Sequence, residues 1–484
     1  MDDLKNKTIY GLVWSFVESF FTYFIQFGIG IFLARILSPK DFGLIGMIAI
    51  FIAISKVFVY AGLGSALIRK KECNQTDYST VFYFSVFVSF VFYGLLLLLS
   101  TGIANFYGES ILKQIVQVFA LGIIFDAFGF VHQTKLNRDL NFKLQAKISF
   151  ISTVLSGCGA IIIAILGYGV WALVMLNLLK TLSTSVLFWV FVKWKPSLVF
   201  NIKALRELFD FGWKLLMVGL IETVYRDGFY LIIGKYYSAA QLGFFNRADR
   251  FQAMISENIA RLIAKVSYPV LSKVDDLIVL KRSYQKLVQN TMFITFILMF
   301  GLAASAEAII LTLLGENWSE SILYLQFLTL VGALYPLQSL NTDILKVFGR
   351  SDLFLKLEIV KKTIAIPVLI FCAFLSIKIL ILGMLIISML SCMLNAFWSS
   401  KLLKYSVLEQ LKDIFPSFLF AIIIGLIVYL VGYLIEIKPL FLLLIQLLLG
   451  ISLVISIGEF ISQPNYMYIK TNLVKVAKGL KNKI

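Results

Sequence analysis

Apolar runs of 18 or more residues recur from one end of the 484-residue chain to the other, and they constrain its fold more than any other feature. A helix of that length crosses the roughly 30 Å hydrocarbon core of a bilayer, where the backbone must satisfy its own hydrogen bonds. The composition agrees, because 60% of the residues are hydrophobic and only 15% are charged, too few to cover a water-soluble surface. The sequence therefore predicts an all-α polytopic membrane protein.

The apolar runs predict about fourteen transmembrane helices. They are expected at residues 9–34, 41–67, 80–104, 113–133, 146–166, 169–192, 213–233, 239–264, 287–313, 322–347, 355–376, 379–400, 414–435 and 439–461. The range 239–264 is unusual among them because it carries many charges.

Positive charge is distributed unevenly between the connecting loops. The net formal charge is +17. With a cytoplasmic N-terminus, most Lys and Arg residues fall in the cytoplasmic loops and the C-terminal tail, while the opposite loops hold few, such as Arg35, Lys40 and Lys235. This is the positive-inside pattern. It predicts that both termini are cytoplasmic, and it explains the basic charge without a nucleic-acid partner.

Two short segments recur at matching places in the chain. ARILSPKDFGL at 34–44 returns as GKYYSAAQLGF at 234–244, and RDLNFK at 138–143 returns as RSDLFLK at 350–356. Spans one to six therefore resemble spans seven to twelve, which predicts two six-helix lobes related by a pseudo-two-fold axis along the membrane normal. The expected organisation is an N-terminal lobe at 1–192, a cytoplasmic amphipathic linker at 193–212 and a C-terminal lobe at 213–400. Two further helices and a basic cytoplasmic tail fill 401–484.

Charges inside predicted spans are the candidate functional residues, because a charge in hydrocarbon is costly unless it faces the protein interior or a wet cavity. In the range 239–264 the residues Arg247, Arg250, Met254, Glu257 and Arg261 are spaced three, four, three and four, so they share one helix face. Four arginines are expected to bind an anionic substrate such as a phosphate or pyrophosphate: Arg226, Arg247, Arg250 and Arg261. The alternative is that each arginine only pairs with an acid to lock two helices together.

Carboxylates in the spans are candidates for coupling to an ion gradient. The main ones are Glu18, Glu222, Asp227 and Glu257; Asp126, Glu307 and Asp343 are weaker candidates of the same kind. The alternative for Glu18 is a hydrogen bond to a neighbouring polar group. Lys56 and Lys180 are expected to reach a cytoplasmic interface by extending their side chains.

Signatures of catalysis are missing from the sequence. It contains no phosphate-binding glycine loop with its lysine, no nucleophile elbow and no HExxH motif. The four cysteines and the single His132 do not form metal-ligand spacings or a disulfide framework. We expect neither an enzyme nor a cofactor or metal. A membrane glycan polymerase or ligase, as an alternative class, usually needs a larger outer loop, and a purely structural scaffold leaves the charges inside the spans unexplained.

Several motifs resemble a known family in their order along the chain. They are LARILSPKDFGLIGMIAIFIAI at 33–54, GLGSALIRKKE at 62–72, LGFFNRADRF at 242–251, LLGENWSESILYLQFL at 313–328 and GRSDLFLK at 349–356. In this order the chain is similar to the polysaccharide-transporter flippases, the Wzx-type exporters of the MATE-like MOP superfamily, and most of all to their colanic-acid and teichuronic-acid branch. One departure is Tyr60-Ala61-Gly62, where many relatives carry an acidic residue before the glycine, so no role of that acid transfers here.

The resemblance implies a flippase that translocates an undecaprenyl-pyrophosphate-linked oligosaccharide across the bacterial cytoplasmic (inner) membrane by alternating access. The cargo would be an O-antigen, lipopolysaccharide, capsule or exopolysaccharide repeat unit. The implied partners are the lipid-linked glycan, membrane lipids, a coupling H+ or Na+, and glycan polymerase machinery. Arg247 and Arg250 lie within a matching motif, whereas Arg226 and Arg261 rest on helix geometry alone. The runner-up function is a MATE-like cation or drug antiporter, whose cavity would be dominated by carboxylates and aromatics.

Overall fold

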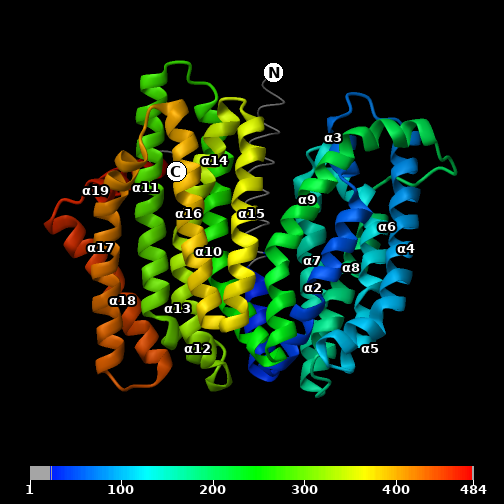
Figure 1. Ribbon diagram of the computed structural model, residues 1–484, viewed down its shortest axis with the longest axis horizontal. Helices are drawn as coiled ribbons and strands as arrows, with labels where there is room; N and C mark the ends of the chain where they lie inside the picture. The colour runs from blue at the N-terminus through cyan, green and yellow to red at the C-terminus, as the bar shows by residue number, and fades with distance from the viewer. Residues whose placement is uncertain (1–21, 23, 482–484) are drawn as a thin grey trace. The chain divides into compact units, whose positions relative to one another are not determined.

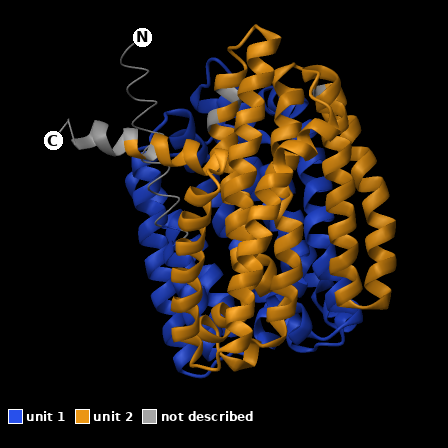
Figure 2. Cartoon of the chain, turned by 90° about the vertical axis from the view of Figure 1, so that its left-hand side faces the viewer, with its two compact units in different colours: residues 1–243 blue, residues 244–484 orange. Residues whose placement is uncertain are grey.

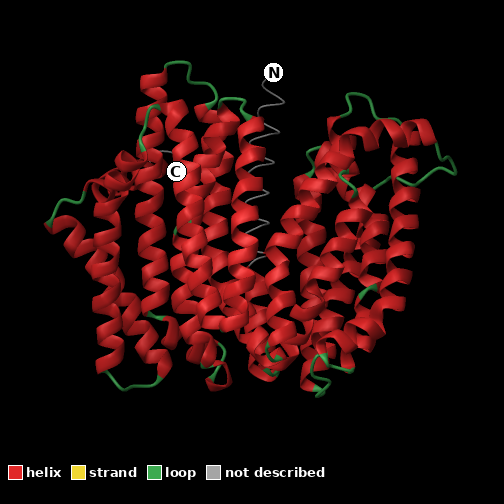
Figure 3. Ribbon diagram, in the orientation of Figure 1, coloured by secondary structure: helices red, strands yellow, loops and turns green. Residues whose placement is uncertain are grey.

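The computed structural model describes residue 22 and residues 24–481 of the chain. Helices dominate this part, and no strand occurs in it (Figures 1 and 3). The described residues form two compact units, 1–243 and 244–484, which Figure 2 distinguishes by colour. The all-α architecture predicted from the apolar runs is confirmed.

The first unit begins with the helix Phe24–Ile36. It continues with α2 (Pro39–Tyr60), α3 (Leu63–Arg69), α4 (Gln75–Tyr107), α5 (Ile111–Phe119), α6 (Leu121–Arg138), α7 (Phe142–Ile165), α8 (Trp171–Phe191) and α9 (Ile202–Tyr236). The next helix, α10 (Ala239–Leu271), begins in the first unit and runs into the second.

The second unit holds the rest of α10 and a longer set of helices. These are α11 (Leu277–Ala304), α12 (Ala306–Leu313), the short 3-10 helix η1 (Glu316–Trp318), α13 (Glu320–Ala333), α14 (Tyr335–Val347), α15 (Ser351–Leu375), α16 (Ile377–Leu403), α17 (Val407–Leu434), α18 (Pro439–Phe460) and α19 (Pro464–Lys481).

In the described part of the chain the predicted spans correspond to these helices, with internal breaks that the apolar pattern did not indicate, whereas residues 9–21 of the first predicted span lie outside the described residues. The second span is interrupted at Ala61 and Gly62, which adopt left-handed backbone conformations with φ of 43° and 68°. The fourth, ninth and tenth are interrupted at Ala120, Ser305 and Leu334. Ten helical segments of the described part are long and apolar enough to cross a membrane. The long helices α9, α10 and α15 are not among these ten, because each carries several charges.

Side-chain caps fix where several helices start. At α2 the Ser38 hydroxyl accepts the backbone N–H of Asp41, the Asp41 carboxylate accepts the Ser38 N–H, and Pro39 occupies the first turn. Asn74 and Asp77 form the same reciprocal pair at α4. Each pair satisfies N–H groups that the first helical turn leaves without partners.

Helix α9 packs along α2 within the first unit and also contacts α3 and α4. It starts at Ile202, where Asn201 caps it, and continues without a break to Tyr236. Within the range 193–212 that was predicted as an amphipathic linker, residues 193–201 are non-helical and the remainder forms the first part of α9. The predicted lobe boundaries remain a prediction.

Two glycines bring the copies of the repeated segment into contact. A Cβ added to Gly43 would lie 1.6 Å from the carbonyl oxygen of Ala239, and one added to Gly243 would lie 1.9 Å from that of Pro39. Positions 39 and 43 correspond to 239 and 243 in the repeat, so the contact is reciprocal. All four residues belong to the first unit.

The core of the second unit forms mainly where α11 packs against α17. Phe293 and Ala304 of α11 are buried against Phe420, Ile424 and Val428 of α17. Burial of such side chains is worth roughly 1.5–3 kcal/mol for each large one in water, whereas inside a bilayer close packing and hydrogen bonds contribute most of the stabilisation.

Candidate functional site

The charged face of α10, defined as Arg247, Arg250, Met254, Glu257 and Arg261, differs from the rest of the helix in burial. Arg250 and Arg261 are exposed, and Glu257 is about half-exposed. Between them Ala248, Phe251 and Ala260 are buried. The helix therefore presents its charges along one side, as the three–four spacing predicts, and packs the unit with its other side.

Arg247 is the member of this face that the fold holds most tightly. Its guanidinium lies over the ring of Trp318 in η1, 5.8 Å from the ring centroid. Trp318 is completely buried and also meets Phe244 edge-on at 6.0 Å. The Ser321 hydroxyl donates to the Phe244 carbonyl at 3.1 Å, which ties the start of α13 to α10. A buried aromatic face can hold a guanidinium in place while its N–H groups remain able to donate.

Sequence reasoning missed Trp318 as part of this site. The residue stands in the short segment GENWSES, within the motif LLGENWSESILYLQFL that indicated only the family resemblance. A lone tryptophan in a polar connection between two spans was the available signal, because such a ring is expensive to expose and usually has a packing partner.

Further along α10, an acid neutralises one of the arginines in part. The Arg261 Nη2 lies 3.7 Å from the Glu257 Oε2 and donates to the Asn258 Oδ1 at 3.0 Å. Arg261 and Glu257 are both about half-exposed, so their ion pair is worth little by itself. Glu257 is therefore as much a partner of Arg261 as a candidate for ion coupling.

The predicted site residues of α9 lie in the first unit. Arg226 is exposed, and its Nε and Nη2 donate to the two carboxylate oxygens of Asp227 at 3.2 and 3.3 Å. Asp227 is buried, whereas Glu222 is exposed. The structure thus brings Arg226 and Asp227 together in one unit and assembles the charged face of α10 in the other.

A second charged cluster lies inside the first unit, among α2, α6 and α8. The Lys56 Nζ forms an ion pair of 2.6 Å with the Asp126 Oδ2, and both side chains are less than one-third exposed. Lys180 interacts electrostatically with both. Lys56 therefore pairs inside the helix bundle instead of extending to an interface, and Lys180 stands near the middle of α8. The pairing contradicts the interfacial position expected for Lys56, because the sequence does not show which spans face each other, whereas the position expected for Lys180 remains a prediction.

The remaining candidates contribute little to a site. Glu18 lies outside the described residues. Asp343 is buried and pairs with Lys346 of the same helix at 2.8 Å. Glu307 is exposed at the start of α12. Among the described residues no group of three or more His, Cys, Asp or Glu side chains is arranged to hold a metal ion.

Solved structures share this fold. The chain matches "Lipid II flippase MurJ, inward closed conformation" with a TM-score of 0.74 and 16% identity, over 93% of this chain and 98% of that one. It also matches an inward-facing multidrug resistance MATE family transporter of the MOP superfamily with a TM-score of 0.62 and 15% identity, over 79% of this chain and 94% of that one. The protein is thus a multi-pass membrane protein with the MurJ- and MATE-type fold.

The sequence comparisons identify the family. Residues 32–323 match the model described as "Polysaccharide biosynthesis protein", and the chain belongs to this family. The teichuronic acid biosynthesis protein TuaB of Bacillus subtilis (strain 168) is 26% identical over 302 residues, 62% of each chain. The lipopolysaccharide biosynthesis protein WzxC of Escherichia coli (strain K12) is 24% identical over 408 residues, 81% of each chain. The match to TuaB thus spans less than two-thirds of that relative's length.

Proposed function

We propose that the protein is a flippase that moves an undecaprenyl-pyrophosphate-linked oligosaccharide across the bacterial cytoplasmic membrane by alternating access. The cargo would be a repeat unit of an O-antigen, capsule or exopolysaccharide. Membership of the polysaccharide biosynthesis family and the fold shared with the lipid II flippase support this proposal. So do the names of the relatives, which concern teichuronic acid and lipopolysaccharide biosynthesis.

The charged face of α10 is the observation that carries the proposal. It presents three arginines and one glutamate along a helix that would otherwise contact apolar surroundings. A pyrophosphate offers several oxygens at the spacing of the guanidinium fork, and each charged hydrogen bond is worth about 1.5–3 kcal/mol. Arg226 of α9, in the first unit, remains a further cation that we propose to bind the anionic cargo. A cationic drug would be repelled by the same face, which disfavours the antiporter.

Arginine–carboxylate pairs offer a route to ion coupling. Asp227 accepts from Arg226, and Glu257 lies beside Arg261. A bound pyrophosphate would compete for these guanidinium groups, and a carboxylate that loses its arginine binds H+ or Na+ more readily. Glu222 and Glu18 would act in the same coupling. We expect Asp227→Asn to bind substrate while making export insensitive to the ion gradient, measured in vesicles with the pH or sodium gradient collapsed.

The decisive experiment for the function is complementation of a strain that lacks the gene. Arg250→Gln should abolish surface glycan and cause lipid-linked oligosaccharide to accumulate in the membrane, because it removes one exposed cation and leaves a neutral polar side chain. Arg282→Gln, an exposed arginine at the start of α11, is the matched control and should export normally. Normal export by Arg250→Gln at equal membrane levels would contradict the role of this face, and drug resistance without any glycan defect would favour the antiporter.

The membrane orientation and an interaction with glycan polymerase machinery belong to the same proposal. The excess of Lys and Arg in alternate loops supports cytoplasmic termini. A cysteine at Lys195 should react with a membrane-impermeant maleimide only after the cells are opened, whereas one at Lys113 should react in intact cells. The opposite pattern would reverse the orientation. Co-purification of the polymerase with the tagged protein tests the interaction.

A further inference from the structure

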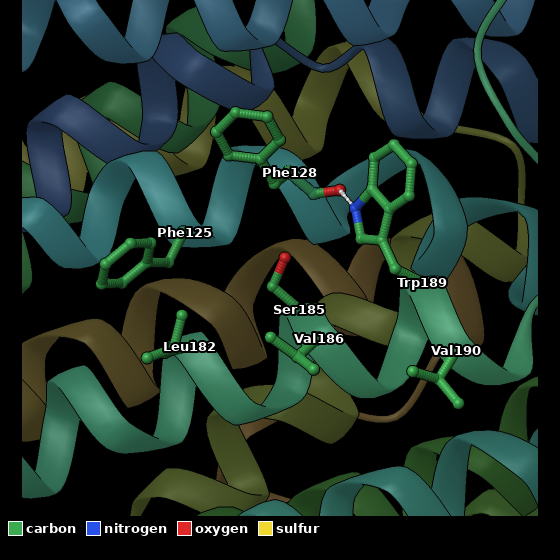
Figure 4. Close-up of a pocket in the computed structure, with 7 residues that line it drawn as sticks. All are labelled: Phe125, Phe128, Leu182, Ser185, Val186, Trp189 and Val190. Carbon is green, nitrogen blue, oxygen red and sulfur yellow. Dashed lines mark hydrogen bonds between the residues drawn. The ribbon is translucent and has the colours of Figure 1, made fainter.

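An apolar groove runs between α6 and α8 on the surface of the first unit (Figure 4). Its volume is about 390 Å³. Phe125 and Phe128 of α6 form one wall, and Val186, Trp189 and Val190 of α8 form the other. Val186 and Val190 are exposed, so the groove is open along its length.

Small residues at the floor and large ones at the rim produce this shape. A Cβ added to Gly129 of α6 would lie 3.2 Å from the ring of Phe188 and 3.4 Å from the Cα of Ser185. The two helices therefore approach closely behind the groove, while Phe128 and Val186 stand apart in front of it. A hydrogen bond from the Trp189 Nε1 to the Phe128 carbonyl, 3.1 Å long, crosses from helix to helix at one end (Figure 4).

The groove extends toward the end of α6 and α8 at which basic residues lie. The Phe128 carbonyl accepts the hydrogen bond from Trp189. One turn further along α6, His132 contacts Trp194, which follows α8, with ring centroids 5.0 Å apart. The two helices therefore run in the same direction. From Leu182 to Val190 the helix rises about 12 Å, close to the roughly 15 Å hydrocarbon depth of one leaflet. Tryptophan at the far end of such a groove is typical of the membrane interface.

Two lysines lie at the end of the groove where α8 finishes. Lys193 and Lys195 come just after α8 and are both exposed. The nearby acids already have partners: Asp139 pairs with Lys135 at 3.6 Å, and Asp77 pairs with Lys70 at 3.0 Å. In the part of the chain that the structure describes, Lys193 and Lys195 form no ion pair.

From this arrangement we propose that the groove is a binding site for an anionic glycerophospholipid. One acyl chain lies against Phe125, Phe128 and Val186, and the phosphate lies at Lys193 and Lys195 beyond Trp189. The apolar walls alone would accept any lipid of the bilayer. The lysines make the site selective, because a cation near the membrane surface favours an anionic headgroup over a zwitterionic one.

Quenching of Trp189 by brominated acyl chains tests the site. The full-length protein is reconstituted in vesicles of phosphatidylcholine that contain either brominated phosphatidylglycerol or brominated phosphatidylcholine. Because the chain has seven tryptophans, the Trp189 signal is taken as the difference between the wild-type protein and Trp189→Phe. We expect the brominated phosphatidylglycerol to quench this signal at a much lower mole fraction than the brominated phosphatidylcholine.

Substitutions of the lysines and of a groove residue test the headgroup and acyl-chain parts of the proposal separately. Lys193→Gln and Lys195→Gln should each lower the apparent affinity for phosphatidylglycerol about fivefold, whereas Lys113→Gln should leave it unchanged. Val186→Phe, which narrows the groove, should reduce quenching of Trp189 by both lipids. Equal quenching by the two brominated lipids would mean that the groove holds only bulk lipid, and displacement of the signal by undecaprenyl phosphate, but not by phosphatidylglycerol, would identify the substrate's tail as the occupant. Either result would overturn the proposal. Glycan export is not part of these measurements, so failure here leaves the proposed function untouched.

Discussion

Replacement of Gly43 by alanine tests the close contact between the two copies of the repeated segment. The new methyl carbon would lie 1.6 Å from the Ala239 carbonyl oxygen, 2.5 Å from its carbonyl carbon and 3.1 Å from its Cα. A carbon and a carbonyl oxygen normally approach to about 3.3 Å. Because all three neighbours are backbone atoms, no side-chain rotation can relieve the overlap, and the start of α2 must move away from Ala239 by more than 1 Å.

The expected loss of stability follows from two opposing effects. Overpacking of this kind costs typically 1–3 kcal/mol, and more when backbone must shift. Alanine gains back at most about 1 kcal/mol over glycine through its helix propensity. We therefore expect a net destabilisation of about 1–2 kcal/mol, a fall of roughly 2–8 °C in the melting temperature of a unit of this size.

Thermal unfolding of the purified protein in detergent, followed by intrinsic fluorescence, measures this difference. Gly102→Ala is the matched control, because a Cβ at Gly102 in α4 meets no atom within 4 Å. It should leave the melting temperature unchanged or raise it. Equal melting temperatures for Gly43→Ala and Gly102→Ala would show that the ends of α2 and α10 do not come as close as described.

Three further contacts can be tested by substitution. Lys56→Gln should destabilise the first unit by about 1–3 kcal/mol, because it leaves Asp126 unpaired in a partly buried position. In thermal unfolding, the double variant with Asp126→Asn should recover part of this loss. Fully additive losses of stability from the two single substitutions would contradict the pairing. Trp318→Leu should lower glycan export more than Trp318→Phe, because only the aromatic ring keeps a π face for Arg247; equal export at equal membrane levels would remove Trp318 from the site. Burial lowers the pKa of Lys70, but its hydrogen bonds to Asp77 and Glu207 raise it more, so the net pKa lies above the ordinary 10.5. The stability that Lys70 adds over Lys70→Met should therefore be constant between about pH 7 and 9 and disappear as the pH rises above about 10.5, and a loss near pH 8 would contradict this.

The sequence predicted the helices better than it predicted their partners. Apolar runs locate a span because the bilayer imposes the same requirement on every crossing helix. The break at Ala120 could not be predicted, since that position has no glycine or proline and keeps right-handed helical dihedral angles. The break at Leu334 did have a signal, because Pro336 stands in the first turn of α14 and a proline interrupts a helix. The sequence also did not predict that α9 continues through Gly212. Gly212 reads as a helix breaker, yet here it allows the backbone of Gly62 to approach closely.

For the candidate site too, the sequence predicted features within one helix better than contacts between helices. The three–four spacing of the charged face of α10 is a property of one helix, so the sequence was sufficient to predict that Arg250 and Arg261 share one side of it. The pairing of Lys56 with Asp126 and the packing of Arg247 on Trp318 join residues that are distant in the chain. Such contacts depend on which helices become neighbours, and a single sequence does not contain that information.

Transbilayer movement of the lipid-linked glycan by the purified protein tests the central claim most directly. The protein is reconstituted in vesicles with a fluorescent undecaprenyl-pyrophosphate oligosaccharide, and an impermeant reductant bleaches only the outer leaflet. The wild-type protein should expose the inner-leaflet pool to bleaching, and Arg250→Gln should slow this by about 10- to 100-fold, the loss of one charged hydrogen-bonding partner. Protection of the inner pool in wild-type vesicles, or equal rates for Arg250→Gln and Arg282→Gln, would contradict the account.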